Sequence, residues 1–196
     1  MDILAHNRPL RIQKGTTLVE VLVAMAVFAF FMLGAASAQL VAISSARDAN
    51  MRSYAAFSAD NLAALIRSNP AFWRNLDLDF ELTVRAATDP ASGVIFPTYT
   101  SATDLSNYGL DFVNGGCNIV NGGCLPAEIA VHDLRKWARN WVTSVVDAIA
   151  IVRNTASPGE TPLLQITLSW RQKQLATDAA ASANTLLNQY STMVKL

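Results

Sequence analysis

Few side chains in this sequence are of types that do chemistry, and their spacing limits what they can do. The two cysteines, Cys117 and Cys124, stand in GGCNIVNGGC. A structural zinc site needs about four ligands, and His6 and His132 are both badly placed to complete one. A disulfide that closes a short glycine-rich loop is the favoured interpretation, and it indicates an oxidising compartment. Two free thiols in a cytosolic loop are the alternative.

The carboxylates and the second histidine do not suggest a reaction centre. Asp77, Asp79 and Glu81 alternate with apolar residues, which predicts a strand over residues 77–82 with the carboxylates on one face. Such a face could bind Ca²⁺, but a solvated strand face explains the alternation as well. His132 fits the polar face of a helix, and there is no nucleophile motif such as G-x-S-x-G. We therefore expect no enzyme activity, no catalytic residue, no metal site and no cofactor.

Glu20 is the one charged residue between Leu18 and Ala38, in an otherwise apolar run. A carboxylate in hydrocarbon is costly unless it is paired, so we expect Glu20 to have a partner. A glutamate that snorkels to the membrane interface one turn inside the helix is the alternative.

The residues ahead of the apolar run predict a topology. This segment contains one acidic residue, Asp2, and three basic residues: Arg8, Arg11 and Lys14. By the positive-inside rule this end stays cytoplasmic, and the body that follows the helix is translocated. An ordinary secretory signal has its small-residue cleavage site after the apolar region, whereas here Gly15 lies before it.

Composition supports one membrane-competent helix and one globular body. The 52% hydrophobic content is concentrated in the apolar run, and beyond Arg47 the sequence is that of an ordinary soluble domain. With 15 basic and 15 acidic residues the formal net charge is zero, which argues against nucleic-acid binding.

Gly15 followed by TTLVEVLVAMAVF resembles the signal of type IV prepilins and pseudopilins. Those proteins combine a short basic leader, a glycine, a glutamate as the fifth mature residue and a long apolar helix. The resemblance implies that residues 1–15 are a cytoplasmic leader peptide, cut by prepilin peptidase between Gly15 and Thr16. It also implies N-methylation of Thr16, although less strongly, because the family usually has phenylalanine at that position.

The same resemblance implies an assembly role for Glu20. Cleavage creates a new amine on Thr16, and in the family the amine of one subunit pairs with the glutamate of a neighbour as the filament grows. The implied partners are other minor pilins, the major pilin, the inner-membrane assembly platform and the prepilin peptidase. The implied location is the inner membrane, with a single pass and a periplasmic C-terminal domain, and then the pilus fibre at the cell surface.

A long helix is predicted over residues 16–69, because no proline interrupts it and Asn69-Pro70 ends it. At 1.5 Å per residue it would be roughly 80 Å long. We expect residues 16–40 to form the transmembrane segment and filament core, and residues 41–69 to be amphipathic. The stripe that would dock on a sheet consists of Met51, Ala55, Leu62, Leu65 and Ile66.

Residues 70–196 are predicted to form the periplasmic globular domain. Pro126 suits the first turn of a helix, and apolar residues follow it at helical spacing: Ala130, Leu134, Trp137, Trp141 and Val145. We interpret the tryptophan pair as core rather than as a ligand platform. Strands are predicted at Ala148–Arg153 and Leu164–Trp170, joined as an antiparallel hairpin through a turn at Ser157–Glu160.

Two stretches of this domain are less regular. Residues 86–123 are rich in Gly, Asn, Thr, Ser and Asp, and by the resemblance they correspond to the variable loop region of pilins. Residues 172–196 are either a short helix or a loop that leads into an edge strand. The expected fold class is α+β and pilin-like: a long N-terminal helix packed on a small antiparallel β-sheet, with a disulfide-closed loop and an additional helix.

A narrower resemblance concerns the second half of the chain. A cysteine just before a helix with Asp133-Leu134-x-x-Trp137, and a late strand ending in Trp170, are similar to the PilV group of minor pilins. This implies a minor pilin that takes part in priming type IV pilus assembly. The alternatives are a type II secretion pseudopilin, a signal-anchored periplasmic enzyme, or an adhesin whose 86–123 loops bind a ligand.

Overall fold

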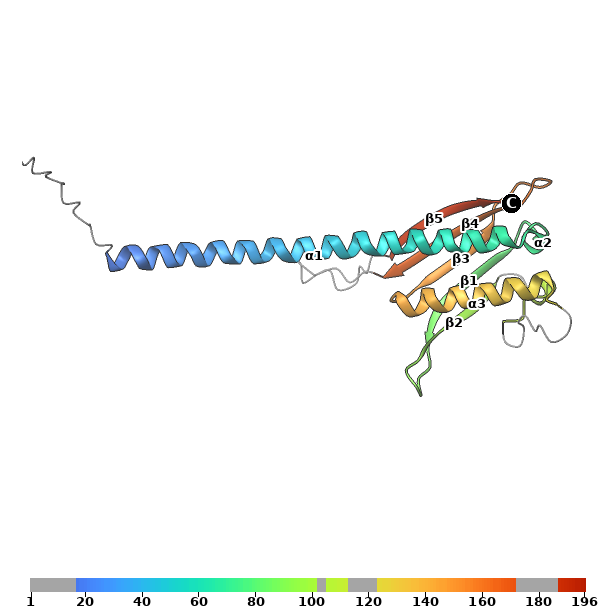
Figure 1. Cartoon of the computed structure of the whole chain (residues 1–196), viewed down its shortest axis with the longest axis horizontal. Helices are drawn as coiled ribbons and strands as arrows, with labels where there is room; N and C mark the ends of the chain where they lie inside the picture. The colour runs from blue at the N-terminus through green and yellow to red at the C-terminus, as the bar shows by residue number, and fades with distance from the viewer. Residues whose placement is uncertain (1–16, 102–104, 113–122, 172–186) are drawn as a thin grey trace, which may run out of the picture. The chain divides into compact units, whose positions relative to one another are not determined.

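The computed structural model describes residues 17–101, 105–112, 123–171 and 187–196 (Figure 1). The chain divides into two compact units, Met1–Arg47 and Asp48–Leu196. Helix α1, Leu18–Ser68, begins in the first unit and ends in the second. Each unit is described by itself below.

The first unit consists, in its described part, of the apolar half of α1. Nearly all its side chains are exposed, and large apolar ones such as Phe30, Phe31 and Leu33 are more than half exposed. By length and composition this helix could cross a membrane, and it is the one such helix in the described part of the chain. Gly34 does not interrupt it, and there is open space where a Cβ at this position would lie.

Helix α1 ends where the sequence predicts that it ends. The residue before a proline is pushed out of the helical region, and α1 stops at Ser68, immediately before Asn69-Pro70. Asn69 is buried, and its side-chain Nδ2 donates a hydrogen bond to the backbone oxygen of Pro126 at 2.7 Å. Pro70 then begins a single helical turn, α2 (Pro70–Trp73). The predicted 16–69 helix is thus confirmed over Leu18–Ser68.

The second unit contains a five-stranded antiparallel sheet in the order β2-β1-β3-β4-β5. The strands are β1 (Glu81–Thr88), β2 (Ile95–Ser101), β3 (Ile149–Asn154), β4 (Leu163–Arg171) and β5 (Leu187–Lys195). A short 3₁₀ helix, η1 (Leu105–Tyr108), and helix α3 (Pro126–Ser144) complete the described elements.

The second half of α1 and α3 lie side by side over one face of this sheet (Figure 1). The predicted stripe on α1 is confirmed, because Ala55, Leu62 and Ile66 have no exposed surface. Met51 and Leu65 are packed against the same core. The alternation in β4 is confirmed too, since every second side chain is buried: Leu164, Ile166, Leu168 and Trp170. The helix at Pro126, both strands of the β3–β4 hairpin, and the turn between them are also as predicted.

The strand predicted at residues 77–82 is wrong over most of its length. Residues 77–80 form a turn in which the Phe80 N–H donates to the Asp77 backbone oxygen at 3.2 Å. The side chain of Asn154, a buried residue of β3, donates to the same oxygen at 2.9 Å. Because this tertiary contact holds the turn, β1 begins only at Glu81. The carboxylates alternate in sequence, but they do not share a strand face.

The loop region predicted over residues 86–123 also needs correction. Strand β1 continues to Thr88, and Ile95–Ser101 form β2, which pairs with β1 in an antiparallel hairpin. The connecting loop is tight, since the Asp89 carboxylate accepts hydrogen bonds from the Ala91 N–H at 2.9 Å and the Ser92 hydroxyl at 2.7 Å. These bonds, the Ser92 one first, lower the pKa of Asp89. Gly93 has φ +69°, a conformation that favours glycine.

Of the two alternatives for residues 172–196, the edge strand is present as β5, which pairs with β4 at one side of the sheet. Residues 172–186 lie outside the described part of the chain. The expected fold class is thus confirmed in its helices and its antiparallel sheet: a long N-terminal helix packed on the sheet together with an additional helix.

Candidate functional site

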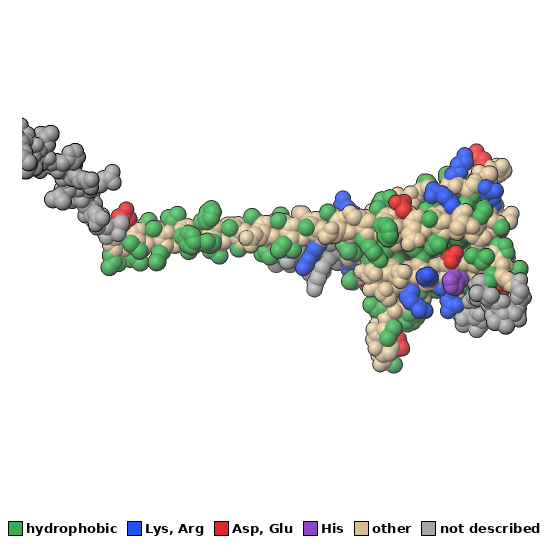
Figure 2. Space-filling view, in the orientation of Figure 1, with side chains coloured by type: hydrophobic (Ala, Val, Ile, Leu, Met, Phe, Trp, Pro, Cys, Tyr) green, Lys and Arg blue, Asp and Glu red, His purple; other side chains and the backbone are tan. Residues whose placement is uncertain are grey.

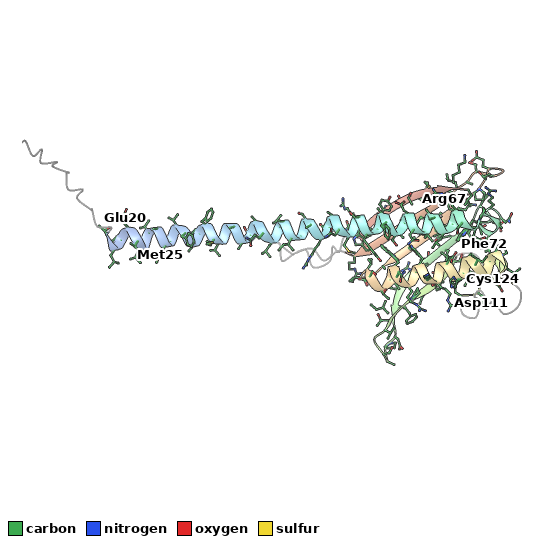
Figure 3. The ribbon with its side chains drawn as sticks, in the orientation of Figure 1. Glu20, Met25, Arg67, Phe72, Asp111 and Cys124 are labelled. Carbon is green, nitrogen blue, oxygen red and sulfur yellow. The ribbon has the colours of Figure 1, made fainter. Side chains whose placement is uncertain are left out.

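Glu20 lies in the first turn of α1 and is exposed (Figure 3). Its backbone N–H donates to Thr17 at two atoms, the carbonyl oxygen at 3.0 Å and the side-chain Oγ1 at 3.3 Å. Thr17 therefore caps the helix, and Thr17-x-x-Glu20 has the spacing of a capping box. This signal was readable in the sequence but was not among our predictions.

The carboxylate of Glu20 has no hydrogen-bond or ion-pair partner among the described residues. Its place in the first turn is favourable, because a negative charge there interacts well with the positive end of the helix dipole. An ammonium group that approached this carboxylate would form a charge-assisted hydrogen bond, one of the stronger polar contacts in proteins.

The residues predicted for cleavage, N-methylation and the disulfide lie mainly outside the described part of the chain. Gly15, Thr16 and Cys117 are among the residues that the structure does not describe. Cys124 is described, and it lies beside the start of α3 (Figure 3). Cleavage, N-methylation and the pairing of Cys117 with Cys124 therefore stay predictions.

The carboxylates considered as a possible Ca²⁺ site, those of Asp77, Asp79 and Glu81, do not form a cation site in the described part of the chain. Asp77 accepts a hydrogen bond from the Tyr108 hydroxyl at 3.0 Å. Glu81 forms an ion pair with Arg153 at 2.7 Å between the carboxylate Oε2 and the guanidinium Nη2. Within the described ranges, no group of three or more His, Cys, Asp or Glu side chains is arranged to hold a metal ion.

His132 and Asp133 are the described pair nearest to an acid–base arrangement. The ring Nδ1 of His132 lies 3.4 Å from Oδ1 of Asp133. The histidine is largely exposed, and adjacent helical residues point in different directions. This geometry fits a polar helix face better than a reaction centre.

The interface of α1 and α3 is where the predicted tryptophans lie. Trp137 is buried and its indole Nε1 donates to the backbone oxygen of Ser58 at 2.9 Å. Trp141 is also buried and stacks on Tyr54, with ring centroids 6.0 Å apart. The interpretation of the tryptophan pair as core is confirmed. The pairs 58/137 and 54/141 also show that the two helices run antiparallel.

Near α3, Tyr99 of β2 stacks on Phe112 at a ring-centroid distance of 4.0 Å. Its hydroxyl is buried without a hydrogen-bond partner among the described residues. Burial raises the pKa of Tyr99 to about 12, against the opposing effect of Arg135 and Arg139 on α3. Its ring therefore contributes packing, and its hydroxyl stays neutral at ordinary pH.

Comparison with known families agrees with the N-terminal pattern. The family model described as the prokaryotic N-terminal methylation motif matches residues 10–36. The match indicates a type IV prepilin-like protein, and the fold is α+β and pilin-like. Comparison with curated proteins and with solved structures gave no match.

The matched range includes Gly15, Thr16 and Glu20. Members of the family with this motif are structural pilins rather than enzymes. The motif implies processing by prepilin peptidase in the membrane context of pilus assembly. The apolar half of α1 fits the single-pass inner-membrane anchor that is typical of prepilins.

Proposed function

We propose that the chain is a minor pilin of the PilV type that takes part in initiating assembly of a type IV pilus. The observation that carries the proposal is the N-terminal methylation motif over residues 10–36, together with Glu20 in the first turn of α1, whose exposed carboxylate has no partner among the described residues. In this proposal the protein acts by joining other subunits, and it turns over no substrate.

Assembly would proceed in two steps. Prepilin peptidase first removes residues 1–15, which creates a free amine on Thr16 for N-methylation. The amine of one subunit then pairs with Glu20 of a neighbour, because in a low-dielectric environment each charge is costly unless it meets the other. The exposed apolar side chains of α1 pack against neighbouring helices in the fibre as they do against lipid beforehand.

The assignment to the PilV type is supported by the helix that carries the Asp133-Leu134-x-x-Trp137 pattern. Leu134 and Trp137 are both buried, and Trp137 joins α3 to α1 through its hydrogen bond to Ser58. We propose that Cys117 and Cys124 form a disulfide that closes the loop before α3, which suits an oxidising periplasm. The implied partners are the major pilin, other minor pilins, and the inner-membrane assembly platform.

A type II secretion pseudopilin is the second candidate, since pseudopilins have the same kind of N-terminal signal and apolar helix. The two are distinguished by deleting the protein from a host that has both systems. A loss of surface pili with normal secretion supports the minor pilin, whereas a loss of secretion with normal pili supports the pseudopilin.

The cleavage step is tested by producing the chain with an active prepilin peptidase and, separately, with a catalytically inactive one. We expect intact-mass measurement to show loss of residues 1–15 only with the active enzyme. A Gly15→Leu variant should stay full length, because a large side chain replaces the glycine that precedes the cut. If the natural chain stays full length with the active peptidase, the proposed function is wrong.

A further inference from the structure

The second unit has a groove between the antiparallel helices α1 and α3, with a volume of about 270 Å³. Its apolar surface is formed by Tyr54, Phe57, Leu65 and Trp137. Trp137 is buried, but Phe57 is 68% exposed. An aromatic ring that the core does not use therefore lines the groove and is open to solvent.

Polar side chains from both helices also line the groove. They are Asn61 from α1 and His132, Asp133, Lys136 and Asn140 from α3. The side chains of Asn61, Lys136 and Asn140 form no hydrogen bond or ion pair with any described residue. An amide side chain can both donate and accept hydrogen bonds. The groove thus presents two amides that are available to a ligand.

The amides lie on both sides of the exposed ring. Because the helices run antiparallel and Trp137 bonds to Ser58, Phe57 lies across the groove from the stretch between Lys136 and Asn140. Asn61 follows Phe57 by one helical turn, so the two share a face of α1. A planar ligand on the ring of Phe57 would have polar groups within reach of its rim on both helices.

The charges in the groove balance. Asp133 contributes one carboxylate and Lys136 one ammonium group, and the Nδ1 atom of His132 lies 3.4 Å from the Oδ1 atom of Asp133. Figure 2 shows acidic and basic side chains next to the histidine over α3. With a neutral imidazole, the groove has no net charge, and it therefore suits an uncharged ligand.

We propose that this groove binds a neutral saccharide, with a sugar ring stacked on Phe57 and its hydroxyl groups bonded to Asn61 and Asn140. A pyranose ring has a face of C–H groups, which the negative face of an aromatic ring attracts. It also has hydroxyl groups around its rim, which an amide can serve as donor and as acceptor.

The polar lining favours a saccharide over an apolar helix of another protein. Such a helix would bury the amides and the ammonium group without partners, which is costly. The volume lies near the lower limit of small-molecule sites, about 300–1,000 Å³, so the groove would hold part of a longer glycan. The inference does not depend on the proposed function, because the groove is the same in a pilin or a pseudopilin.

The test uses the full chain, purified in a detergent without a sugar headgroup, because an alkyl glycoside would compete for the groove. The probes are two neutral saccharides, chitotriose and lactose, and one acidic saccharide, a heparin tetrasaccharide. Ligand-observed NMR titration measures their dissociation constants. We expect a neutral probe to bind more tightly than the acidic one. Preference for chitotriose indicates an N-acetylated glycan such as that of a cell wall, and preference for lactose indicates a galactose-terminated surface glycan.

Variants then locate the site. Phe57→Ala should raise the dissociation constant of the preferred probe about tenfold, because the stacking surface is lost, whereas Phe57→Trp should retain binding. Asn61→Ala with Asn140→Ala should weaken binding by a similar factor. Phe96→Ala, at a half-exposed position of β2 outside the groove, should leave binding unchanged. An unchanged thermal midpoint by circular dichroism shows that each variant is folded.

The inference is overturned if neither neutral probe binds, or if folded Phe57→Ala and the amide variant bind as tightly as the natural chain. It is also overturned if the heparin probe binds best, because the charges of α3, including Arg135 and Arg139 in an adjoining pocket, would then decide the ligand. These outcomes leave the proposed function standing as long as the leader is cut. If the leader is not cut and a neutral probe binds, the proposed function fails and the saccharide site stands.

Discussion

At the scale of single residues, Glu20 has two roles that chemistry can separate. Its backbone N–H donates to the Thr17 hydroxyl, which caps the start of α1, and its side chain has the position that a capping box uses. Its charge is what subunit docking would need. Glutamine can replace glutamate in a capping box, but it cannot form an ion pair. The two roles therefore respond to different substitutions.

We expect Glu20→Gln to reduce surface piliation nearly as far as deletion of the protein does. Thr17→Ala removes the hydroxyl that caps α1, which costs about 0.5–2 kcal/mol of helix stability, but it keeps the carboxylate. Thr17→Ala should therefore leave most piliation intact. The amount of pilus protein sheared from cells measures both effects. Normal piliation in the Glu20→Gln strain, beside a defective deletion strain, would exclude the docking role.

The residue scale also shows how far the sequence predicts function. Glu20 stands out from the sequence alone, because a carboxylate in an apolar run has few explanations. The cap by Thr17 could have been predicted from the Thr-x-x-Glu spacing alone. The hydrogen bond from Trp137 to Ser58 could not be predicted, since the two residues are far apart in the chain and meet only in the folded unit.

At the scale of elements, the packing of α3 on α1 depends on two buried tryptophans with different polar environments. The indole N–H of Trp137 is hydrogen-bonded. That of Trp141 is buried without a partner among the described residues. The two residues are otherwise matched, since both are almost fully buried and their rings stack on each other 6.4 Å apart.

Replacing each tryptophan by phenylalanine removes the same group of atoms, so the difference between the two variants measures the different polar environments of the two indole N–H groups. We expect Trp137→Phe to lower the free energy of unfolding by about 1 kcal/mol more than Trp141→Phe does. Trp141→Phe also removes an unpaired buried donor, which offsets part of its packing loss. Denaturant unfolding of the full chain in detergent, followed by circular dichroism, measures both. Equal losses would contradict the expected stabilisation of Trp137 over Trp141 by its bond to Ser58.

Elements with strong periodicity were predicted from the sequence, and elements defined by tertiary contacts were not. Strand β4 alternates cleanly, and α3 has apolar residues at helical spacing. Strand β2 was missed because Pro97 and several hydroxyl residues weaken its strand signal. The false start of β1 at Asp77 arose because a turn fixed by Asn154 has the same polar–apolar alternation as a strand.

At the scale of the whole molecule, the hydrophobic core lies entirely within the second unit. Every buried apolar residue in the described part of the chain falls between Ala55 and Val194. The second half of α1 supplies part of this core through Ala55, Leu62 and Ile66, together with Ala59 and Ala63. The sequence stripe did not include these last two alanines, because alanine is a weak signal of burial compared with leucine or isoleucine.

This distribution predicts which fragments fold. A fragment of residues 48–196 keeps the whole core, so we expect it to be soluble without detergent and to unfold in one cooperative transition. A fragment of residues 70–196 lacks the α1 part of the core. Burying a leucine or isoleucine side chain contributes about 1.5–3 kcal/mol, so losing Leu62, Ile66 and three alanines removes much of a typical stability of about 5–15 kcal/mol.

The shorter fragment also exposes the sheet face and the side of α3 that α1 covers, including Trp137. We therefore expect it to aggregate or to lack a cooperative transition, whereas the longer one gives a sharp thermal midpoint by circular dichroism. A third fragment, residues 48–196 with Leu62→Ala and Ile66→Ala, should fall between the two. If residues 70–196 fold as cooperatively as residues 48–196, the second half of α1 is an attachment to the globular unit, and its buried stripe is not needed for folding.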